Sequence, residues 1–267
     1  MSTVGEIERR TQERIIKLFR ESLGYRYLGD WEERENNSNI EEDILRDYLV
    51  NKANYQVELA NRAIYKLQTE ARNYDRNLYN NNKEVYKLLR YGDATKANPG
   101  DRYSRVHFIN WNEPEQNDFA IAEEVTYQGN HEKRPDIVLY VNGIAVGVLE
   151  LKRSTVSIGD GIRQNIVNQQ PEFIQSFFPT IQLVMAGNDT EGLRYGAIGT
   201  PEKFFLNWKE DIEDNSMLQL DKYLSKICNK HRLLELIRDF VVFDGGAKKL
   251  PRHHQYFGIK AAQEHVR

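Results

Sequence analysis

The sequence predicts an α/β fold, in which helices flank a central mixed β-sheet and an additional N-terminal helical layer precedes the sheet. Two observations lead to this prediction. Helical periodicity dominates 5–23 and 40–89, whereas after Gly100 short apolar runs alternate with Pro, Asn and Gly, as is typical of strands. The order of a helix, three antiparallel strands, a helix and a further strand predicts a sheet with helices on both faces.

The first helix is expected over 5–23, and Gly24 is a natural stop for it. Its apolar stripe at helical spacing consists of Ile15, Ile16, Phe19 and Leu23, and Glu8 and Gln12 fall on the same stripe. The tract 40–89 contains an Asn run at 80–82 that predicts a break, and hence two or three helices. Because Asn and Tyr are frequent there, this helical insertion of about 40–92 is expected to be a solvated layer and not part of the core.

The second half of the chain supplies the strands and the remaining helices. Strands are expected at 106–111, 119–127, 136–141, 144–152, 181–186 and 195–198. Helices are expected at 160–169, 171–178, 217–228 and 231–240. We therefore expect one domain over 1–243, followed by a flexible basic linker that starts the segment 244–267.

Composition narrows the class of protein. The 267 residues include 40% apolar and 29% charged residues, which is typical of a globular protein. A net charge of −3 argues against a protein that coats nucleic acid by bulk electrostatics. Cys228 is the only cysteine, which excludes an internal disulfide and a Cys-rich zinc site. No apolar run approaches the roughly 18 residues of a membrane helix and no signal peptide is visible, so a cytoplasmic protein without membrane contact is expected.

The stretch 134–152 carries the chemistry. Asn142-Gly143 is a strong hairpin signal, and folding back there returns Glu150 to the level of Asp136. Glu150 and Lys152 are two residues apart and therefore project from one face of the second strand. One or two carboxylates are enough to hold Mg²⁺ against a phosphate, and a lysine offsets the charge that develops during phosphodiester hydrolysis.

The register of this hairpin decides whether the acidic groups meet. With a plain two-residue turn Asp136 faces Leu149, and the two acids point to opposite sides of the sheet. The site assembles only if a three-residue loop ends in a bulge that sets Asp136 opposite Glu150, or if the chain kinks near Asp136. We therefore predict one of these two devices.

A simpler interpretation competes with catalysis. A bare Glu-x-Lys at a strand end is usually an exposed ion pair. Here it follows a Pro-Asp at the mouth of an apolar hairpin and precedes a helix that offers Arg163 and Gln164 to the same end of the sheet. The pattern alone leaves a metal-dependent nuclease and a structural hairpin as alternatives.

The motif and its surroundings resemble a known family. Pro135-Asp136 followed by Glu150-Leu151-Lys152 matches the PD-(D/E)xK nuclease signature. Four segments are similar to the N-terminal endonuclease domain of the R (HsdR) subunit of type I restriction-modification enzymes. In chain order they are NDFAIAEEVTYQG, RPDIVLYVNGIAVGVLELKRS, GIRQNIVNQ and AGNDTEGLRYGAIGTPEK. The resemblance covers most of the chain.

The resemblance implies a function. It implies Mg²⁺-dependent endonuclease cleavage of unmodified double-stranded DNA, as part of a type I site-specific deoxyribonuclease. The implied partners are double-stranded DNA and the modification (M) and specificity (S) subunits, and ATP would serve only the motor of the full-length R subunit.

The resemblance also implies roles for individual residues. Asp136 and Glu150 would be the metal ligands and Lys152 the catalytic lysine. Glu8 lies where related nucleases often place an extra acid, although a first-turn Glu also favours the helix dipole. Gln164 would open a Gln-xxx-Tyr element, but Asn168 occupies the last position, and Gln164 is also consistent with a helix surface amide.

Basic residues and the tail complete the expectations. A DNA-contacting rim is expected from Lys133, Arg134, Arg153 and Arg163 around Lys152, although such charges are commonly only solvated. The end of the chain resembles the entry to a superfamily 2 helicase motor, in which Gln255 would read adenine. No Gly-x-x-x-x-Gly-Lys-Ser/Thr sequence is present, so a truncated motor without a phosphate cradle is expected.

Two rival functions stay open. The same fold is consistent with a non-catalytic scaffold that docks other subunits and tracks duplex DNA, although a scaffold does not need Asp136, Glu150 and Lys152 together. Another PD-(D/E)xK enzyme, such as a DNA repair nuclease, is the second rival, and the helicase-like tail argues against it.

Overall fold

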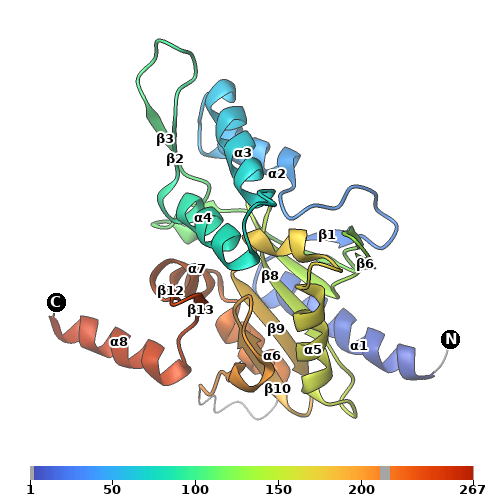
Figure 1. Ribbon diagram of the computed structural model, residues 1–267. Coiled ribbons are helices and arrows are strands. Elements are labelled where there is room, and N and C mark those ends of the chain that lie inside the picture. The colour runs from blue at the N-terminus through green and yellow to red at the C-terminus, as the bar shows by residue number, and fades with distance from the viewer. Residues whose placement is uncertain (1–2, 211–216, 267) are drawn as a thin grey trace.

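The architecture is a mixed α/β fold built on one seven-stranded sheet (Figure 1). The computed structural model describes residues 3–210 and 217–266, and the side chains of 9–210 and 217–265. In spatial order the strands are β1 (Arg26–Asp30), β4 (Phe119–Glu123), β7 (Ile137–Val141), β8 (Ile144–Leu151), β9 (Leu183–Asn188), β10 (Gly192–Gly196) and β11 (Leu206–Asn207). The pairs β1/β4 and β8/β9 are parallel and the other pairs are antiparallel, which confirms the predicted mixed sheet.

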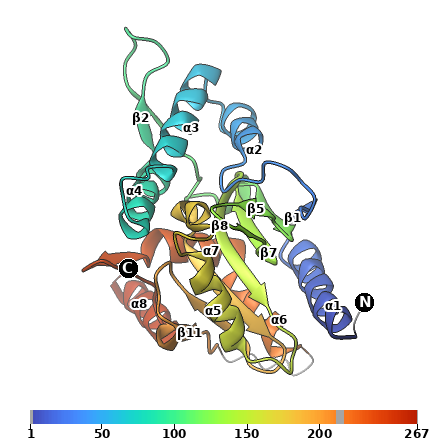
Figure 2. The ribbon, with the colours of Figure 1, turned by 45° about the vertical axis from the view of Figure 1, so that its right-hand side comes forward.

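Helices cover both faces of this sheet. One face packs on α1 (Thr3–Lys17), α6 (Gln219–Ile227) and α7 (Lys230–Asp239), and the other on α5 (Ile158–Asn168) (Figure 2). Successive side chains of strand β7 illustrate the division. Leu139 packs in the apolar core that includes residues of α1, α6 and α7, whereas Val138 and Tyr140 pack in a separate apolar core on the opposite face. The parallel step from β8 to β9 passes through α5, as expected of a crossover helix.

The helical layer is present but is more buried than the sequence predicts. It consists of α2 (Glu42–Asp47), a π-helical turn (Tyr48–Lys52), α3 (Val57–Ala71) and α4 (Leu78–Tyr91). The break falls before Asn77, whose side chain caps α4, and not at 80–82. Asn82 is fully buried and donates to carbonyl oxygens of a distant 3₁₀ helix (Gln175–Thr180) and its flank, so the prediction of a solvated layer is wrong.

Several strand predictions also change. The segment 106–111 is irregular except for Val106, which ends the small hairpin of β2 (Asp93–Thr95) and β3 (Ser104–Val106). The short edge strands β1 and β11 were not predicted, because each offers few apolar residues to a periodicity argument. In place of the helix predicted over 171–178, the structure has the 3₁₀ helix Gln175–Thr180, which contains Pro179. A further small hairpin joins β5 (Tyr127–Gln128) to β6 (Glu132–Lys133), and two more 3₁₀ turns are Pro114–Gln116 and Glu202–Phe204.

The C-terminal segment is ordered into a hairpin and a helix. Strands β12 (Val242–Asp244) and β13 (Ala247–Lys249) pair around Gly245-Gly246, and α8 (His253–Val266) follows. Lys248 is buried and donates to Asn82 Oδ1 at 2.9 Å and Gln182 Oε1 at 2.6 Å. The expected flexible linker is therefore wrong, because burial of this lysine anchors the hairpin on the helical layer. Among the described residues, no helix combines the length and the apolar character that crossing a bilayer requires.

Candidate active site

The hairpin β7–β8 turns at Asn142-Gly143, as the sequence predicts. Both residues have positive φ, 53° and 80°, which is the conformation of a two-residue type I′ turn. Asn142 is fully buried and its side chain donates to Phe108 O at 2.9 Å and to Asn117 Oδ1 at 2.8 Å, while its Oδ1 accepts from Asp118 N at 2.7 Å. The turn end of the hairpin is thus locked by a satisfied polar network.

A bulge inside the hairpin corrects the register. Val141 pairs with Ile144 and Tyr140 with Ala145, but Leu139 pairs with Gly147, so that Val146 is the extra residue. Beyond the last pair, Ile137 with Leu149, Asp136 comes level with Glu150. The predicted need for a bulge is confirmed, whereas its expected places, in a three-residue loop or as a kink at Asp136, are wrong.

Asp136, Glu150 and Lys152 come together at the open end of the hairpin, on the face of the sheet that α5 covers. Asp136 Oδ2 accepts a hydrogen bond from the backbone nitrogen of Leu151 at 2.6 Å, which ties the first acid to the strand of the second. Gly161 of α5 lies against them, since a Cβ there would be 3.6 Å from Glu150 Cβ and 3.5 Å from Lys152 Cγ. The helix packs directly over both side chains, of which Glu150 is fully buried and Lys152 is partly exposed.

Glu150 is the most unusual group in this cluster. Its side chain is fully buried, and within the described part of the chain neither carboxylate oxygen has a hydrogen-bond partner. Burial, and after it the charge of Asp136, raises the pKa of Glu150 well above its ordinary value, and the Lys152 ammonium opposes that shift. A buried carboxylate without a donor is strongly destabilising unless a proton or a cation satisfies it.

The donor set suits a hard divalent cation. Such an ion takes oxygen ligands, and Mg²⁺ usually keeps several waters and needs only one or two carboxylates from the protein. The carboxylate oxygens of Glu150, together with the neighbouring carboxylate of Asp136, provide these ligands. Among the described side chains, those of 9–210 and 217–265, no cluster of three or more His, Cys, Asp or Glu groups is arranged to hold a metal.

A second polar network, which sequence reasoning did not predict, lies next to the site. The amide of Gln12 on α1 donates to Glu123 Oε2 at 2.8 Å and to Glu124 Oε1 at 2.9 Å. Tyr27 also donates to Glu123, and the backbone nitrogen of Glu124 donates to Asp136 O at 2.9 Å. The position of Gln12 on the apolar stripe of its helix was the available signal. The network fixes the end of β4 against the start of β7, where the catalytic aspartate is predicted.

The other predicted catalytic residues are less fully placed. The side chain of Glu8, on α1, lies outside the described residues. Gln164 lies on α5 one turn after Gly161 and is partly buried. Asn168 is buried on the same helix, and its amide nitrogen and oxygen both lack partners among the described atoms. The roles of these residues stay predictions.

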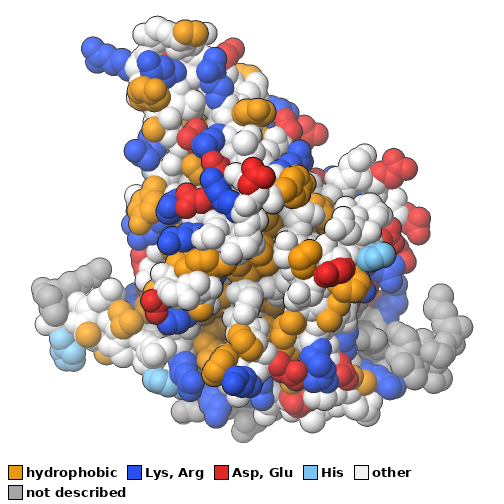
Figure 3. Space-filling view, viewed as in Figure 1, with side chains coloured by type: hydrophobic (Ala, Val, Ile, Leu, Met, Phe, Trp, Pro, Cys, Tyr) orange, Lys and Arg blue, Asp and Glu red, His pale blue; other side chains and the backbone are white. Residues whose placement is uncertain are grey.

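The predicted basic rim is largely engaged by acids of the same chain. Arg134 pairs with Glu124 at 2.7 Å and also with Glu32, and Arg163 pairs with Asp160 and Glu202. The Lys133 ammonium lies 4.4 Å from the centroid of the Phe173 ring. For Arg153 no ion pair is present within the described residues. Basic and acidic side chains are interspersed over the face seen in Figure 3.

Gln255 lies on the exposed first turn of α8. Its Oε1 accepts a hydrogen bond from the backbone nitrogen of Arg252 at 2.8 Å, which caps the start of that helix. The amide thus has a local structural partner, and adenine recognition stays a prediction.

Comparison with known proteins gives a consistent family. The sequence profile of the family "Type I restriction enzyme R protein N terminus" matches residues 7–203. The putative type I restriction enzyme MjaVIIIP endonuclease subunit of Methanocaldococcus jannaschii is 26% identical over 264 residues, covering 91% of this chain and 24% of the relative. The type I restriction enzyme HindI endonuclease subunit of Haemophilus influenzae is 25% identical, covering 68% of this chain and 19% of the relative.

A third relative, from Escherichia coli, is the type I restriction enzyme EcoprrI endonuclease subunit, which is 26% identical over 54% of this chain and 47% of the relative. The chain therefore spans between 19% and 47% of the length of these three curated relatives. The profile match extends from α1 across the acidic hairpin to β10, which includes Asp136, Glu150 and Lys152. The chain belongs to the family of type I restriction enzyme R protein N-terminal domains.

Proposed function

We propose that this domain is a Mg²⁺-dependent endonuclease that hydrolyses phosphodiester bonds of double-stranded DNA. The observation that carries the proposal is the fully buried Glu150 carboxylate, which has no hydrogen-bond partner among the described residues and lies beside Asp136. A structural acid in that position would be expected to have donors, as Glu123 has. Glu150 lacks them and is therefore suited to a cation.

Each residue of the cluster has a distinct role in the proposal. Asp136 and Glu150 hold the ion at the open end of the hairpin. A bound Mg²⁺ supplies Lewis-acid polarisation of the phosphoryl oxygen. Lys152, two residues after Glu150 on the same strand face, offsets the negative charge that grows in the transition state and orients the attacking water. The Gln12 network holds the backbone from which Asp136 projects.

The wider assembly is part of the proposal. Because the relatives are endonuclease subunits of type I restriction enzymes, we expect this chain to act on unmodified DNA in a cytoplasmic complex with modification and specificity subunits. ATP is expected to act only through a motor on the full-length R subunit. The two acidic partners of Arg134 favour weak contacts of the domain with DNA. Membership of the type I family, and not these ion pairs, leads us to expect that target recognition resides in the specificity subunit.

Calorimetric titration with Mn²⁺ tests the metal site, and nicking of supercoiled plasmid tests the chemistry. We expect the wild type to bind Mn²⁺, and Asp136→Ala to lose both metal binding and nicking. Glu58→Ala is the matched control, because Glu58 is an exposed carboxylate on α3 in the helical layer. Equal behaviour of the wild type and Asp136→Ala, without metal heat and without nicking, would instead favour the non-catalytic scaffold.

A further inference from the structure

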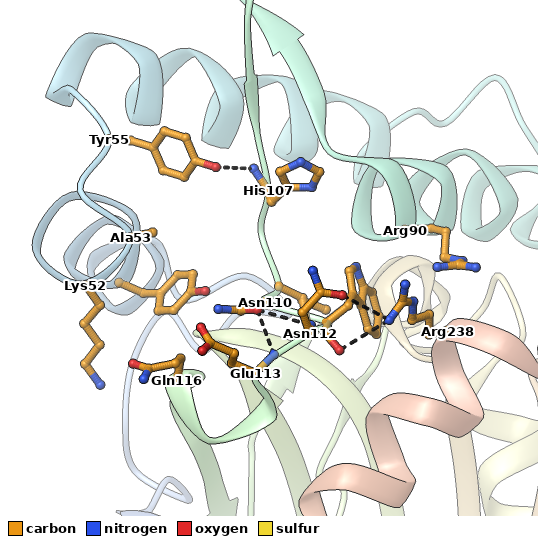
Figure 4. A pocket seen from close by; sticks show the side chains of 13 residues that line it. Lys52, Ala53, Tyr55, Arg90, His107, Asn110, Asn112, Glu113, Gln116 and Arg238 are labelled. Atoms are coloured by element: carbon orange, nitrogen blue, oxygen red, sulfur yellow. Dashed lines mark hydrogen bonds between the residues drawn. The ribbon is translucent and has the colours of Figure 1, made fainter.

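A polar cavity lies near the turn end of the β7–β8 hairpin, away from the cluster of Asp136, Glu150 and Lys152. Its volume is about 560 Å³, and its walls come from the π-helical turn, α4, the loop before β4 and α7. Figure 4 shows Tyr55 and Lys52 on one side of this cavity and Arg238 and Arg90 on the other. The proposed nuclease function does not use any of these residues.

The cavity is separated from the catalytic cluster by the length of the hairpin. Asn110 lines the cavity, and its backbone is bonded to Asn117, which also receives the Asn142 amide at the turn. Asn142 is six residues from Asp136, which corresponds to about 20 Å of extended strand. A ligand in the cavity would therefore not touch the metal site.

Cationic side chains converge on the cavity from separate elements. Lys52 ends the π-helical turn, Arg90 comes from the last turn of α4, and Arg238 comes from α7. Glu113 is the acidic side chain that lines it. Asp239 lies outside the lining and reaches Arg90 at 3.3 Å and Arg238 at 3.7 Å. These long ion pairs leave a surplus of positive charge facing the cavity.

Some hydrogen-bond donors that line the cavity lack a short hydrogen bond to an acceptor of the described residues. Within the described residues, the Nε of Arg238 is buried without a hydrogen-bond partner, because the Asp239 carboxylate that it faces is 3.7 Å away. The same side chain makes only long contacts, of 3.4 Å, with Trp111 O and Asn112 Oδ1 (Figure 4). The Tyr55 hydroxyl accepts the backbone N–H of His107 at 3.1 Å and keeps its own proton to donate. Such donors suit an acceptor-rich anion, and a planar guanidinium suits phosphate above all.

Aromatic rings lie among these donors. Trp111 is held by a bond from its indole nitrogen to Leu89 O at 3.2 Å and is only partly buried, and Tyr55 stands on the opposite wall. Aromatic faces beside basic groups bind nucleotides by stacking the base while the cations receive the phosphate. We propose that this cavity is a nucleotide-binding site outside the catalytic centre, with the phosphate on Arg238 and Arg90 and the base against the aromatic side chains that line it.

The nucleotide has two sources, a free nucleotide or a unit of a DNA strand, and two probes distinguish them. Deoxyadenosine monophosphate is titrated by calorimetry, and a short labelled duplex is titrated by fluorescence anisotropy at several salt concentrations. Both titrations are made with chelator present, so that the proposed metal site does not contribute. The variants are Arg238→Gln and Lys52→Gln, and the matched control is Arg62→Gln, an exposed arginine on α3 outside the cavity.

We expect Arg238→Gln to weaken binding of the mononucleotide about tenfold and Lys52→Gln to weaken it about threefold, with no change in the control. If only the duplex responds, with its salt slope reduced by about one in each variant, the site takes a DNA strand. The exposed Lys52 provides a test that does not depend on the folding of the Arg238 variant. Absence of mononucleotide binding, together with equal duplex affinity and equal salt slope in the wild type and both variants, would overturn the proposal.

Discussion

The two ends of one hairpin bury polar side chains under opposite conditions. At the turn, Asn142 is fully buried and each polar atom of its side chain is bonded, to Phe108, Asn117 and Asp118. At the open end, Glu150 is equally buried, and its carboxylate has no partner among the described residues. The same strands therefore hold one satisfied and one unsatisfied group about 20 Å apart.

This difference separates structural from functional burial. A satisfied buried amide contributes to stability and fixes the register of the hairpin. An unsatisfied buried carboxylate lowers stability, and it persists where a ligand or a reaction requires it. Three substitutions test whether the two ends differ in this way, and Lys152→Met has the largest expected effect.

Lys152→Met should reduce plasmid nicking by on the order of a hundredfold to a thousandfold, the effect of removing one group that stabilises transition-state charge. Because the two carboxylates stay in place, Mn²⁺ affinity measured by calorimetry should remain within about threefold of the wild type. Nicking at the wild-type rate would show that the open end does not use this lysine for chemistry.

Asn142→Ala should lower the free energy of unfolding by about 3 kcal/mol, because it leaves the partners of the amide unsatisfied and places Ala at a positive φ. Urea unfolding measures the change in the free energy of unfolding, and the affinity for Mn²⁺ should stay the same. Asn51→Ala, at an exposed position, is the control and should change stability by less than about 0.5 kcal/mol. Loss of metal binding without loss of stability would contradict a purely structural turn end.

Glu150→Gln should stabilise the metal-free protein by about 2 kcal/mol near pH 8 and abolish Mn²⁺ binding. The folded-state pKa of Glu150 is raised, so between the ordinary value of 4.5 and that folded pKa the folded state holds a proton that the unfolded state has released. Wild-type stability therefore falls as pH rises through this window, and the variant should lack that fall.

Urea melts at several pH values, in chelator, measure this dependence. Glu123→Gln is the matched control, since Glu123 is a buried carboxylate that accepts hydrogen bonds from Gln12 and Tyr27. Its substitution should destabilise the protein. A loss of stability in Glu150→Gln equal to that in Glu123→Gln would mean that Glu150 is a structural acid as well.

The sequence correctly predicts the sheet and the proximity of Asp136 and Glu150, but not the position of the bulge that brings these two residues level. Alternation and the Asn142-Gly143 pair locate the hairpin, and the chemistry of the acids requires a shifted register. The bulge at Val146 is invisible because β8 is buried on both faces, so its apolar run has no contrast between inward and outward residues.

The burial of polar residues in the helical layer and in the C-terminal segment could not be predicted from the sequence either. The Asn run at 80–82 is typical of a break, yet Asn82 is satisfied by carbonyl oxygens of Phe178, Pro179 and Ile181, about a hundred residues away in the chain. Lys248 follows two glycines, which is typical of a linker, but its partners are Asn82 and Gln182. Local pattern carries no information on partners so distant in sequence.

The substitution Lys248→Met has the smallest expected effect. It tests how a buried amine is accommodated when its hydrogen-bond partners are neutral oxygens. Burial lowers the pKa of Lys248 well below 10.5, so between that folded pKa and 10.5 the unfolded state holds a proton that the folded state has released. The free energy of unfolding of the wild type should therefore rise with pH in this window, relative to that of Lys248→Met. Urea melts of both proteins from about pH 8 to about pH 10 measure the difference. Parallel pH profiles would show that Lys248 keeps its proton in the fold, and that neutral acceptors satisfy a buried cation as completely as the network of Asn142 satisfies a buried amide.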